Sequence, residues 1–188
     1  QILAAISHDL QTPITRMRLR ADMSEDSPEK DKLLHDLGEI ERLVQDGIAY
    51  ARSAHGNGER FSRIDLASFI ESLSYDYQDT GKSVTVNGVI QGTVSTKPYA
   101  LRRILSNLVD NALKFAGAAE ISVDRKGEGE VVITVLDRGP GIPQEQLEAA
   151  MQPFFRLEQS RNRETGGSGL GLAIAQQLTA ALGGSIRL

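Results

Sequence analysis

The sequence predicts an α+β protein in which an N-terminal helical hairpin precedes an α/β sandwich. Over residues 1–55, apolar side chains recur at intervals of three and four, which is typical of amphipathic helices. Beyond residue 61, short alternating stretches typical of strands are mixed with further amphipathic helices. These strands and helices follow no regular βαβ repeat, which favours an α+β sandwich over a parallel sheet.

Composition narrows the classes of function. The chain has 188 residues, of which 40% are hydrophobic and 24% charged, an ordinary globular balance. The net charge is −4 and the sequence contains no block of basic residues, so we do not expect nucleic acid as a partner. The absence of cysteine excludes disulfides and thiolate metal sites. No apolar run approaches the roughly 20 residues that cross a bilayer, so we expect no direct membrane contact from these residues.

The hairpin comes first in chain order. A turn at residues 24–28 separates its helices, and Pro28 suits a helix start. The second helix extends to about Ala51, and residues 56–62 have the composition of a linker. Two amphipathic helices alone bury their stripes poorly, so we expect a homodimer that forms a four-helix bundle. The two stripes contain Leu3, Ile6, Leu10, Ile14, Met17 and Ala21, then Leu33, Leu37, Ile40, Val44 and Ile48.

The elements of the second region follow over residues 63–188. We expect helices at 66–73, 98–115, 144–150 and 171–182, and strands at 83–90, 92–95, 120–125, 131–137 and 185–188. Because the chain opens inside a helical pattern and closes on a predicted strand, we expect both ends to belong to a longer protein.

His8 is a candidate nucleophile on the first helix. On a helical wheel it falls nearly opposite the apolar stripe, with Thr12 one turn further on and Asp9 beside it. Neutral imidazole is a good nucleophile near pH 7, and an adjacent carboxylate can take the proton of the second ring nitrogen. A lone histidine on a polar face is more often merely solvated. However, a proline inside a helix, such as Pro13, destabilises it by about 3 kcal/mol. A hairpin with only a structural role would have little reason to contain one.

A second group of residues suggests a nucleotide site. Asn107, Asn111 and Lys114 share one face of the 98–115 helix, where amide oxygens and an ammonium can hold Mg²⁺ and phosphate. Asp137 follows a strand and begins a turn with Gly139 and Gly141, where a carboxylate can accept a hydrogen bond from an adenine amino group. The alternatives are an ordinary polar helix face and an ordinary Asp-Gly turn.

Three glycines precede the last helix. Backbone N–H groups at Gly167, Gly169 and Gly171 can face a phosphate at a helix N-terminus. A Rossmann interpretation needs a strand just before them, and the polar stretch 159–165 excludes it. We expect residues 143–166 to form a mobile lid that Phe154 and Phe155 pin. Arg156, Arg161 and Arg163 are candidate phosphate contacts, although surface charge is favoured for the last two.

Taken in order, these motifs resemble the cytoplasmic core of bacterial sensor histidine kinases of two-component systems. Residues 7–13 resemble the H-box of that family and residues 107–115 its N-box. Residues 137–141 resemble its G1 box, 153–155 its F-box and 167–171 its G2 box. One departure is Gln11, where arginine is frequent in the family.

The resemblance implies a dimerisation and histidine-phosphotransfer hairpin (1–55), a linker (56–62) and a catalytic domain of the Bergerat ATP-binding fold (63–188). It implies that His8 accepts the phosphoryl group, Asp9 acts as acid/base and Thr12 serves phosphatase activity. Asn111 matches the Mg²⁺ ligand. The residues that match the nucleotide site are Asn107, Asn111, Lys114, Phe115, Asp137, Gly139, Gly141, Ile142, Arg156, Gly167, Gly169, Leu170 and Gly171. Among them Phe115 packs on adenine, Asp137 reads it and Lys114 contacts phosphate.

The function implied is ATP-dependent autophosphorylation of His8, with Mg²⁺, and transfer to an aspartate of a response regulator. Phosphatase activity towards the phosphorylated regulator is also implied, in a membrane-anchored parent with this core on the cytoplasmic side of the bacterial inner membrane. Two alternatives stay open. One is an ATP-gated conformational clamp like gyrase and Hsp90, and the other is a dimeric scaffold biased towards phosphatase activity.

Overall fold

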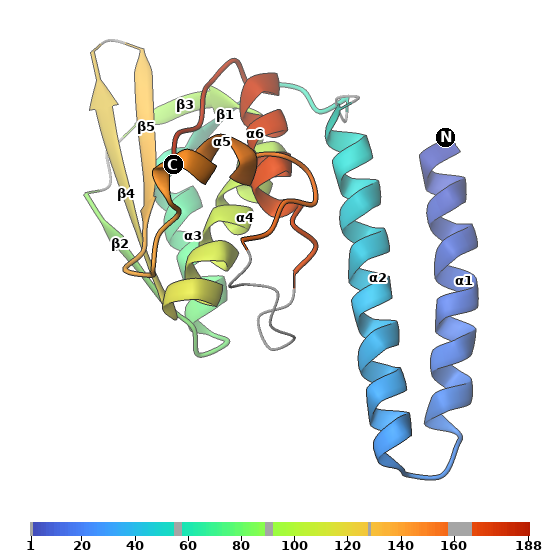
Figure 1. The fold of residues 1–188 in the computed structure, drawn as a ribbon. Coiled ribbons are helices and arrows are strands. Elements are labelled where there is room, and N and C mark those ends of the chain that lie inside the picture. Colours follow the sequence, from blue (N-terminus) through green and yellow to red (C-terminus); the bar gives the residue numbers. More distant parts are fainter. Residues whose placement is uncertain (1, 55–57, 89–91, 128, 158–166) are drawn as a thin grey trace.

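The fold consists of a long helical hairpin beside an α/β unit (Figure 1). A computed structural model describes residues 2–54, 58–88, 92–127, 129–157 and 167–188; for residues 2–9 and 52–54 it describes the backbone alone. The predicted α+β class is confirmed. Among the described helices, none combines the length and the apolar character needed to span a bilayer.

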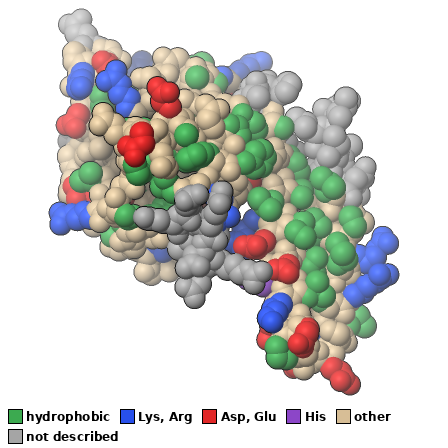
Figure 2. Space-filling model, viewed as in Figure 1, with side chains coloured by type: hydrophobic (Ala, Val, Ile, Leu, Met, Phe, Trp, Pro, Cys, Tyr) green, Lys and Arg blue, Asp and Glu red, His purple; other side chains and the backbone are tan. Residues whose placement is uncertain are grey.

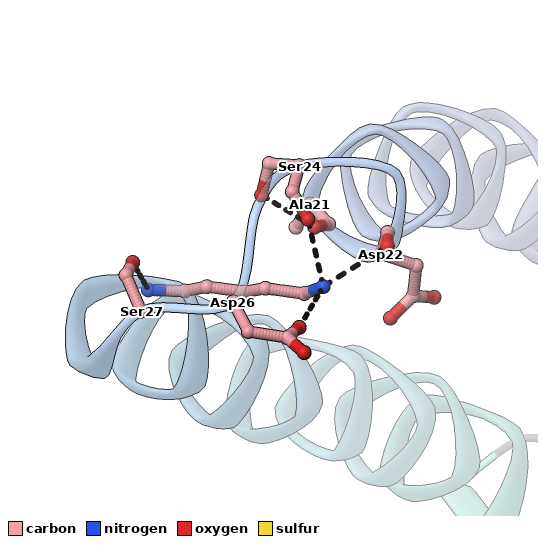
Figure 3. Close-up of polar contacts among 6 residues, drawn as sticks. Ala21, Asp22, Ser24, Asp26 and Ser27 are labelled. Carbon is pink, nitrogen blue, oxygen red and sulfur yellow. Dashed lines mark hydrogen bonds and ion pairs between the residues drawn. The ribbon is translucent and has the colours of Figure 1, made fainter.

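The hairpin consists of α1 (Ile2–Asp22) and α2 (Pro28–Ala54). A lysine holds the turn between them. The Lys30 ammonium donates to the backbone oxygens of Asp22 at 3.0 Å and Ser24 at 2.9 Å, and to Asp26 Oδ1 at 2.9 Å (Figure 3). Ser27 caps α2 by accepting the Lys30 N–H at 3.1 Å. These bonds replace the partners that the two helix ends lack.

The hairpin buries only part of its apolar side chains. Ile14, Ala21 and Leu37 are buried. Among the described side chains of the hairpin and its turn, a further group of large apolar residues is exposed, and Figure 2 shows hydrophobic groups along the hairpin. The exposed residues are Leu10, Met17, Leu19, Met23, Leu33, Ile40 and Leu43. The expectation that a single hairpin cannot bury both stripes is therefore met by this chain.

The α/β unit comprises residues 62–188. Its elements are β1 (Ser62–Asp65), α3 (Leu66–Gln78), β2 (Ser83–Asn87), β3 (Thr93–Thr96), α4 (Pro98–Ala116), β4 (Ala118–Lys126), β5 (Glu130–Leu136), the 3₁₀ turn η1 (Gln144–Gln146), α5 (Leu147–Ala150) and α6 (Gly171–Ala181). In one sheet β4 lies between β2, which is parallel to it, and β5, which is antiparallel. A separate antiparallel pair joins β1 to β3.

The main core lies between the sheet and helices α3 and α4. Fully buried side chains from these helices, including Ile70, Leu105 and Val109, meet Ile121 and Val123 of β4. Burial of large aliphatic side chains contributes about 1.5–3 kcal/mol each, so this layer anchors α4 firmly. The polar face of α4 is thereby held in one orientation.

Several sequence predictions differ from the structure. The helix predicted at 66–73 continues to Gln78, because Tyr77 is half-buried and packs on the core. Residues 185–188 were predicted as a strand, and this is wrong: they are irregular, and Ile186 packs against α6 and its neighbours instead. Strand β1 was not predicted, because Ile64 is its only apolar residue and one apolar residue cannot form an alternating apolar and polar pattern. The last two residues of the predicted 83–90 strand, 89 and 90, lie outside the described residues.

Candidate nucleotide-binding site

Helix α4 carries the first wall of the site. Asn107, Asn111 and Lys114 follow one another at i, i+4 and i+7 on one face, as predicted. Both asparagines are half-buried and Lys114 is exposed. The opposite stripe of α4 lies in the core, so the three polar side chains are fixed on the side away from the sheet. Val109 is fully buried in that stripe.

Asn107 has an unsatisfied polar group. Its Nδ2 is buried, and no hydrogen-bond partner for it exists among the described residues. Buried polar groups are nearly always paired, so an orphaned amide indicates a place for a bound water or ligand. A Cβ built on Gly171 would lie 3.8 Å from Asn107 Oδ1. Asn107 therefore lies against the N-terminus of α6.

The surroundings of Lys114 favour the binding of an anion. Its Nζ is 4.7 Å from the centre of the Phe115 ring. A Cβ on Gly167 would come within 2.7 Å of the same Nζ, so the glycine-rich backbone closely approaches the ammonium. Although Lys114 is exposed in part, the burial of the rest of its side chain lowers its pKa, and the charge of Arg156 lowers that pKa further. Both effects would be relieved by a bound phosphate, whose negative charge favours the ammonium form.

Asp137 forms the second wall at the end of β5. The Gly139 N–H donates to Asp137 Oδ1 at 2.8 Å, which closes a tight turn and leaves the exposed carboxylate with further acceptor capacity. A Cβ on Gly139 would be 3.0 Å from Asp137 Oδ1 and 3.3 Å from the Phe115 carbonyl oxygen. Gly141 has φ +72°, a conformation that suits glycine, and Ile142 beyond it is half-buried. The turn thus packs against the end of α4 beside Phe115.

The glycine-rich segment forms the third wall. Gly169 has φ +69°, and a Cβ there would meet the Phe155 carbonyl oxygen at 2.7 Å. The Phe154 N–H donates to the Gly169 carbonyl oxygen at 2.9 Å, and Phe154 itself has φ +64°, uncommon for a residue with a side chain. Leu170 is fully buried and anchors the segment just before α6 begins at Gly171.

Ser168 is a site residue that the sequence analysis missed. Its Oγ accepts the Leu170 N–H at 3.2 Å, which stabilises the turn between two of the glycines. Serine hydroxyls often form hydrogen bonds with the backbone two residues further along the chain, so a serine between glycines could have indicated this turn from sequence. Arg156 is half-buried near Lys114. Arg161, Arg163 and most of the C-terminal half of the predicted lid lie outside the described residues.

The helix that carries the predicted acceptor lies apart from these walls. His8 and Asp9 fall within the continuous helix α1, and their side chains lie outside the description. Thr12 is exposed, and Pro13 lies inside the helix. In Figure 1, α2 lies between α1 and the α/β unit. The structure therefore brings the nucleotide-site candidates together and leaves the helix of the predicted acceptor, His8, on the other side of α2.

Two glycine substitutions should affect different properties, one of them ATP binding and the other stability. We expect Gly167→Ala to leave stability nearly unchanged, since its Cβ meets only the flexible end of Lys114, but to weaken ATP binding by displacing that ammonium. We expect Gly169→Ala to cost at least about 1 kcal/mol of stability, because it clashes with backbone and requires positive φ. Thermal unfolding and nucleotide titration of both variants separate the two effects. Equal melting temperatures for both variants would contradict this assignment.

Comparison with known proteins identifies the family. Residues 96–188 match the family model described as Histidine kinase-, DNA gyrase B-, and HSP90-like ATPase. The whole chain aligns with the sensor histidine kinase GtrS of Pseudomonas aeruginosa at 38% identity, covering 38% of that protein. It aligns over 99% of its length with the sensor protein RstB of Escherichia coli at 35% identity, covering 44% of it. This chain belongs to the sensor histidine kinases.

Solved histidine kinases share its fold. Full-length ShkA in complex with AMPPNP has a TM-score of 0.70 and 25% identity, over 96% of this chain and 41% of that one. The histidine kinase AdeS of Acinetobacter baumannii has a TM-score of 0.67 and 22% identity, over 96% of this chain and 89% of that one. This histidine kinase chain spans about two-fifths of the length of the curated relatives named above. The three walls of the candidate nucleotide site all fall inside the matched ATPase region.

Proposed function

We propose that this chain binds ATP with Mg²⁺, phosphorylates itself on His8 and passes the phosphoryl group to an aspartate of a response regulator. The observation that carries the proposal is the convergence of three segments. The polar face of α4, the turn at Asp137 and the glycine-rich segment before α6 meet in one place. They come from separate parts of the chain and together suit a base, a phosphate chain and a cation.

The described residues fit ATP. The orphaned Asn107 amide and the crowding of Lys114 by Arg156 are both relieved by an anionic, hydrogen-bonding ligand. Asp137 would accept from the adenine amino group while Phe115 packs on the ring. Lys114, Arg156 and the backbone at Gly167, Gly169 and Gly171 would hold the phosphates.

The same face of α4 suits Mg²⁺. Amide oxygens are ligands that Mg²⁺ accepts, and the ion usually combines one or two protein groups with phosphate oxygens. Asn111 would supply the protein oxygen, with Asn107 in support. When bound, the ion neutralises charge on the phosphates, while the side chains of this chain provide positioning.

His8 and Asp9 supply the acceptor chemistry. One imidazole nitrogen forms a bond to the γ-phosphorus as the bond from that phosphorus to the bridging oxygen of ADP breaks. Asp9 takes the proton from the other ring nitrogen. A water positioned by Thr12 would serve the phosphatase activity proposed towards the phosphorylated regulator.

The exposed apolar side chains of the hairpin support a homodimer. A second copy would cover the stripes that a single hairpin leaves open, as in a four-helix bundle. We assign residues 1–55 to dimerisation and phosphotransfer, 56–62 to a linker and 63–188 to catalysis. By the likeness to sensor kinases, we place this core on the cytoplasmic side of a bacterial inner membrane, anchored by other parts of its parent.

Incubation with γ-labelled ATP and Mg²⁺ tests the proposal. We expect label on the protein that is labile in acid and stable in base, and that moves to a receiver domain with an intact acceptor aspartate. Bound nucleotide without any label would refute the kinase activity and favour the ATP-gated clamp or the phosphatase-biased scaffold.

The pKa of Lys114 predicts a pH effect on ATP binding. Because the folded protein without nucleotide lowers this pKa and phosphate would raise it, binding takes up a proton when pH exceeds the lowered value. We expect ATP affinity to fall as pH rises through the pKa of the nucleotide-free state. The fold itself gains stability over the same interval, since the unfolded chain then binds more protons there.

Calorimetric titrations of ATP at increasing alkaline pH check this effect. Parent affinity should approach that of Lys114→Gln, whose own affinity should vary little with pH. The exposed Lys126 offers a matched control, because Lys126→Gln should retain the pH dependence of the parent. Parallel pH profiles for the parent and Lys114→Gln would contradict the role of Lys114.

A further inference from the structure

Helix α4 is capped by a residue from outside its own neighbourhood. Its N-cap residue, Lys97, makes no side-chain capping bond. Instead, the Glu59 carboxylate accepts the Tyr99 N–H at 2.8 Å and the Ala100 N–H at 3.1 Å. A carboxylate is favourable there, because the first N–H groups of a helix lack intrahelical partners and carry partial positive charge. Glu59 lies in the segment between α2 and β1.

A second contact supports the same segment. Lys97 Nζ lies 5.1 Å from the centre of the Phe61 ring, a cation–π arrangement. The Phe61 ring is 53% exposed, so apolar burial accounts for only part of its placement. We call residues 58–61 the strap. Both of its contacts are made to the start of α4.

The hairpin and the α/β unit also touch through an apolar cluster. Ala49 of α2 is buried against Ile104 of α4 and Ile174 of α6, with Tyr50 packed beside them. Helix α6 begins at Gly171 in the nucleotide site, and α4 carries Asn107, Asn111 and Lys114. The strap and this cluster therefore hold the hairpin against the two helices that build the site.

The strap shortens the connection between the two parts. Seven residues (55–61) separate Ala54, the last of α2, from Ser62, which is paired with Thr96. With Glu59 bound to α4, only four residues (55–58) remain before an attachment point. An extended residue spans about 3.3–3.6 Å, so releasing Glu59 adds about 10 Å of reach. That length matters because α2 lies between the acceptor helix and the site (Figure 1).

We propose that Glu59 is a releasable latch that restrains autophosphorylation. While its carboxylate caps α4, the short connection keeps the α/β unit against α2, away from the acceptor helix. Release lengthens the connection, and the nucleotide site can then approach a His8 of its own chain or of a second copy. The kinetic part of this inference depends on the proposed kinase function, and the structural part does not.

Two variants separate the latch from the stability of α4. Glu59→Gln removes the charge and weakens the cap. Lys97→Asp adds a carboxylate at the N-cap, where it can accept the same two N–H groups locally. The double variant Glu59→Gln/Lys97→Asp therefore keeps α4 capped while the strap is free. It also removes the ammonium above Phe61.

Spin-label distances within one chain are the direct measurement. The parent has no cysteine, so cysteines introduced at the exposed Arg42 and Tyr75 place one label on α2 and one on α3. Dilution with unlabelled chain restricts the signal to one protomer. We expect a narrow distribution for the parent and distributions extended by up to about 10 Å for both variants.

Kinetics complete the test. At saturating ATP we expect both variants to autophosphorylate at least about threefold faster, with ATP affinity within about twofold of the parent, because a larger fraction reaches the competent arrangement. Glu71→Gln, an exposed glutamate of α3, should match the parent in every measurement.

An unchanged distance distribution in both variants overturns the latch, and so does a broadened distribution with an unchanged or lower rate. If the parent itself takes no label, the proposed function fails. The distances still decide whether Glu59 fastens the two parts together.

Discussion

His8→Ala is expected to abolish acid-labile phosphorylation while ATP affinity stays unchanged. The proposed acceptor is a single imidazole on α1, and alanine provides no nucleophile in its place. The proposed nucleotide contacts lie on α4, after β5 and before α6, with α2 between them and α1 (Figure 1). Removing one side chain from α1 should therefore leave ATP binding intact. Label incorporation and nucleotide titration on the same preparations measure the two effects.

The hairpin offers a matched control for this substitution. His35 lies on α2, is exposed, and has its Nε2 3.9 Å from Glu39 Oε1. It thus resembles His8 in residue type and in having a nearby carboxylate, but it lacks the Thr-Pro that follows His8. We expect His35→Ala to incorporate label like the parent. Label that survives His8→Ala, or that disappears in His35→Ala, would contradict the assignment of the acceptor.

The parts of the site that depend on local periodicity were predictable from sequence. Asn107, Asn111 and Lys114 are separated by four and three residues, and a long amphipathic helix necessarily puts them on one face. Asp137 was predicted at the point where alternation gives way to a glycine turn, and the structure places it one residue after β5. In both cases the sequence pattern that predicts the helix or strand lies close in the chain to the site residues themselves, within about one helical turn or one strand.

The features that escaped prediction depend on long-range contacts. Glu59 caps α4 from about forty positions away in the chain, and helix-start signals are sought next to the helix itself. The pairing of β1 with β3 likewise joins two strands that α3 and β2 separate along the chain. The packing of Ala49 on α6 needs the relative placement of two parts of the chain, which periodicity does not contain.

Asp137→Ala should lower ATP affinity by about 10- to 100-fold, since a hydrogen bond to a charged group contributes roughly 1.5–3 kcal/mol and each 1.4 kcal/mol is tenfold. One carboxylate oxygen already accepts the Gly139 N–H at 2.8 Å, which orients the group beside Phe115. The remaining acceptor capacity faces solvent and can take an amino hydrogen from adenine. Guanine has a carbonyl oxygen at the corresponding position, so selectivity for ATP over GTP should fall with the affinity. Competition titrations with both nucleotides measure this.

Asp137→Asn separates the base contact from the turn. Its amide oxygen can still accept the Gly139 N–H, so we expect a melting temperature near that of the parent, while the negative charge that favours an amino donor is gone. Its ATP affinity should fall between those of the parent and Asp137→Ala. Asp124→Ala, at an exposed position of β4 in the same sheet, should bind both nucleotides like the parent. If Asp137→Ala retained parental affinity, or if Asp124→Ala lost as much, the adenine contact would have to lie elsewhere in the site.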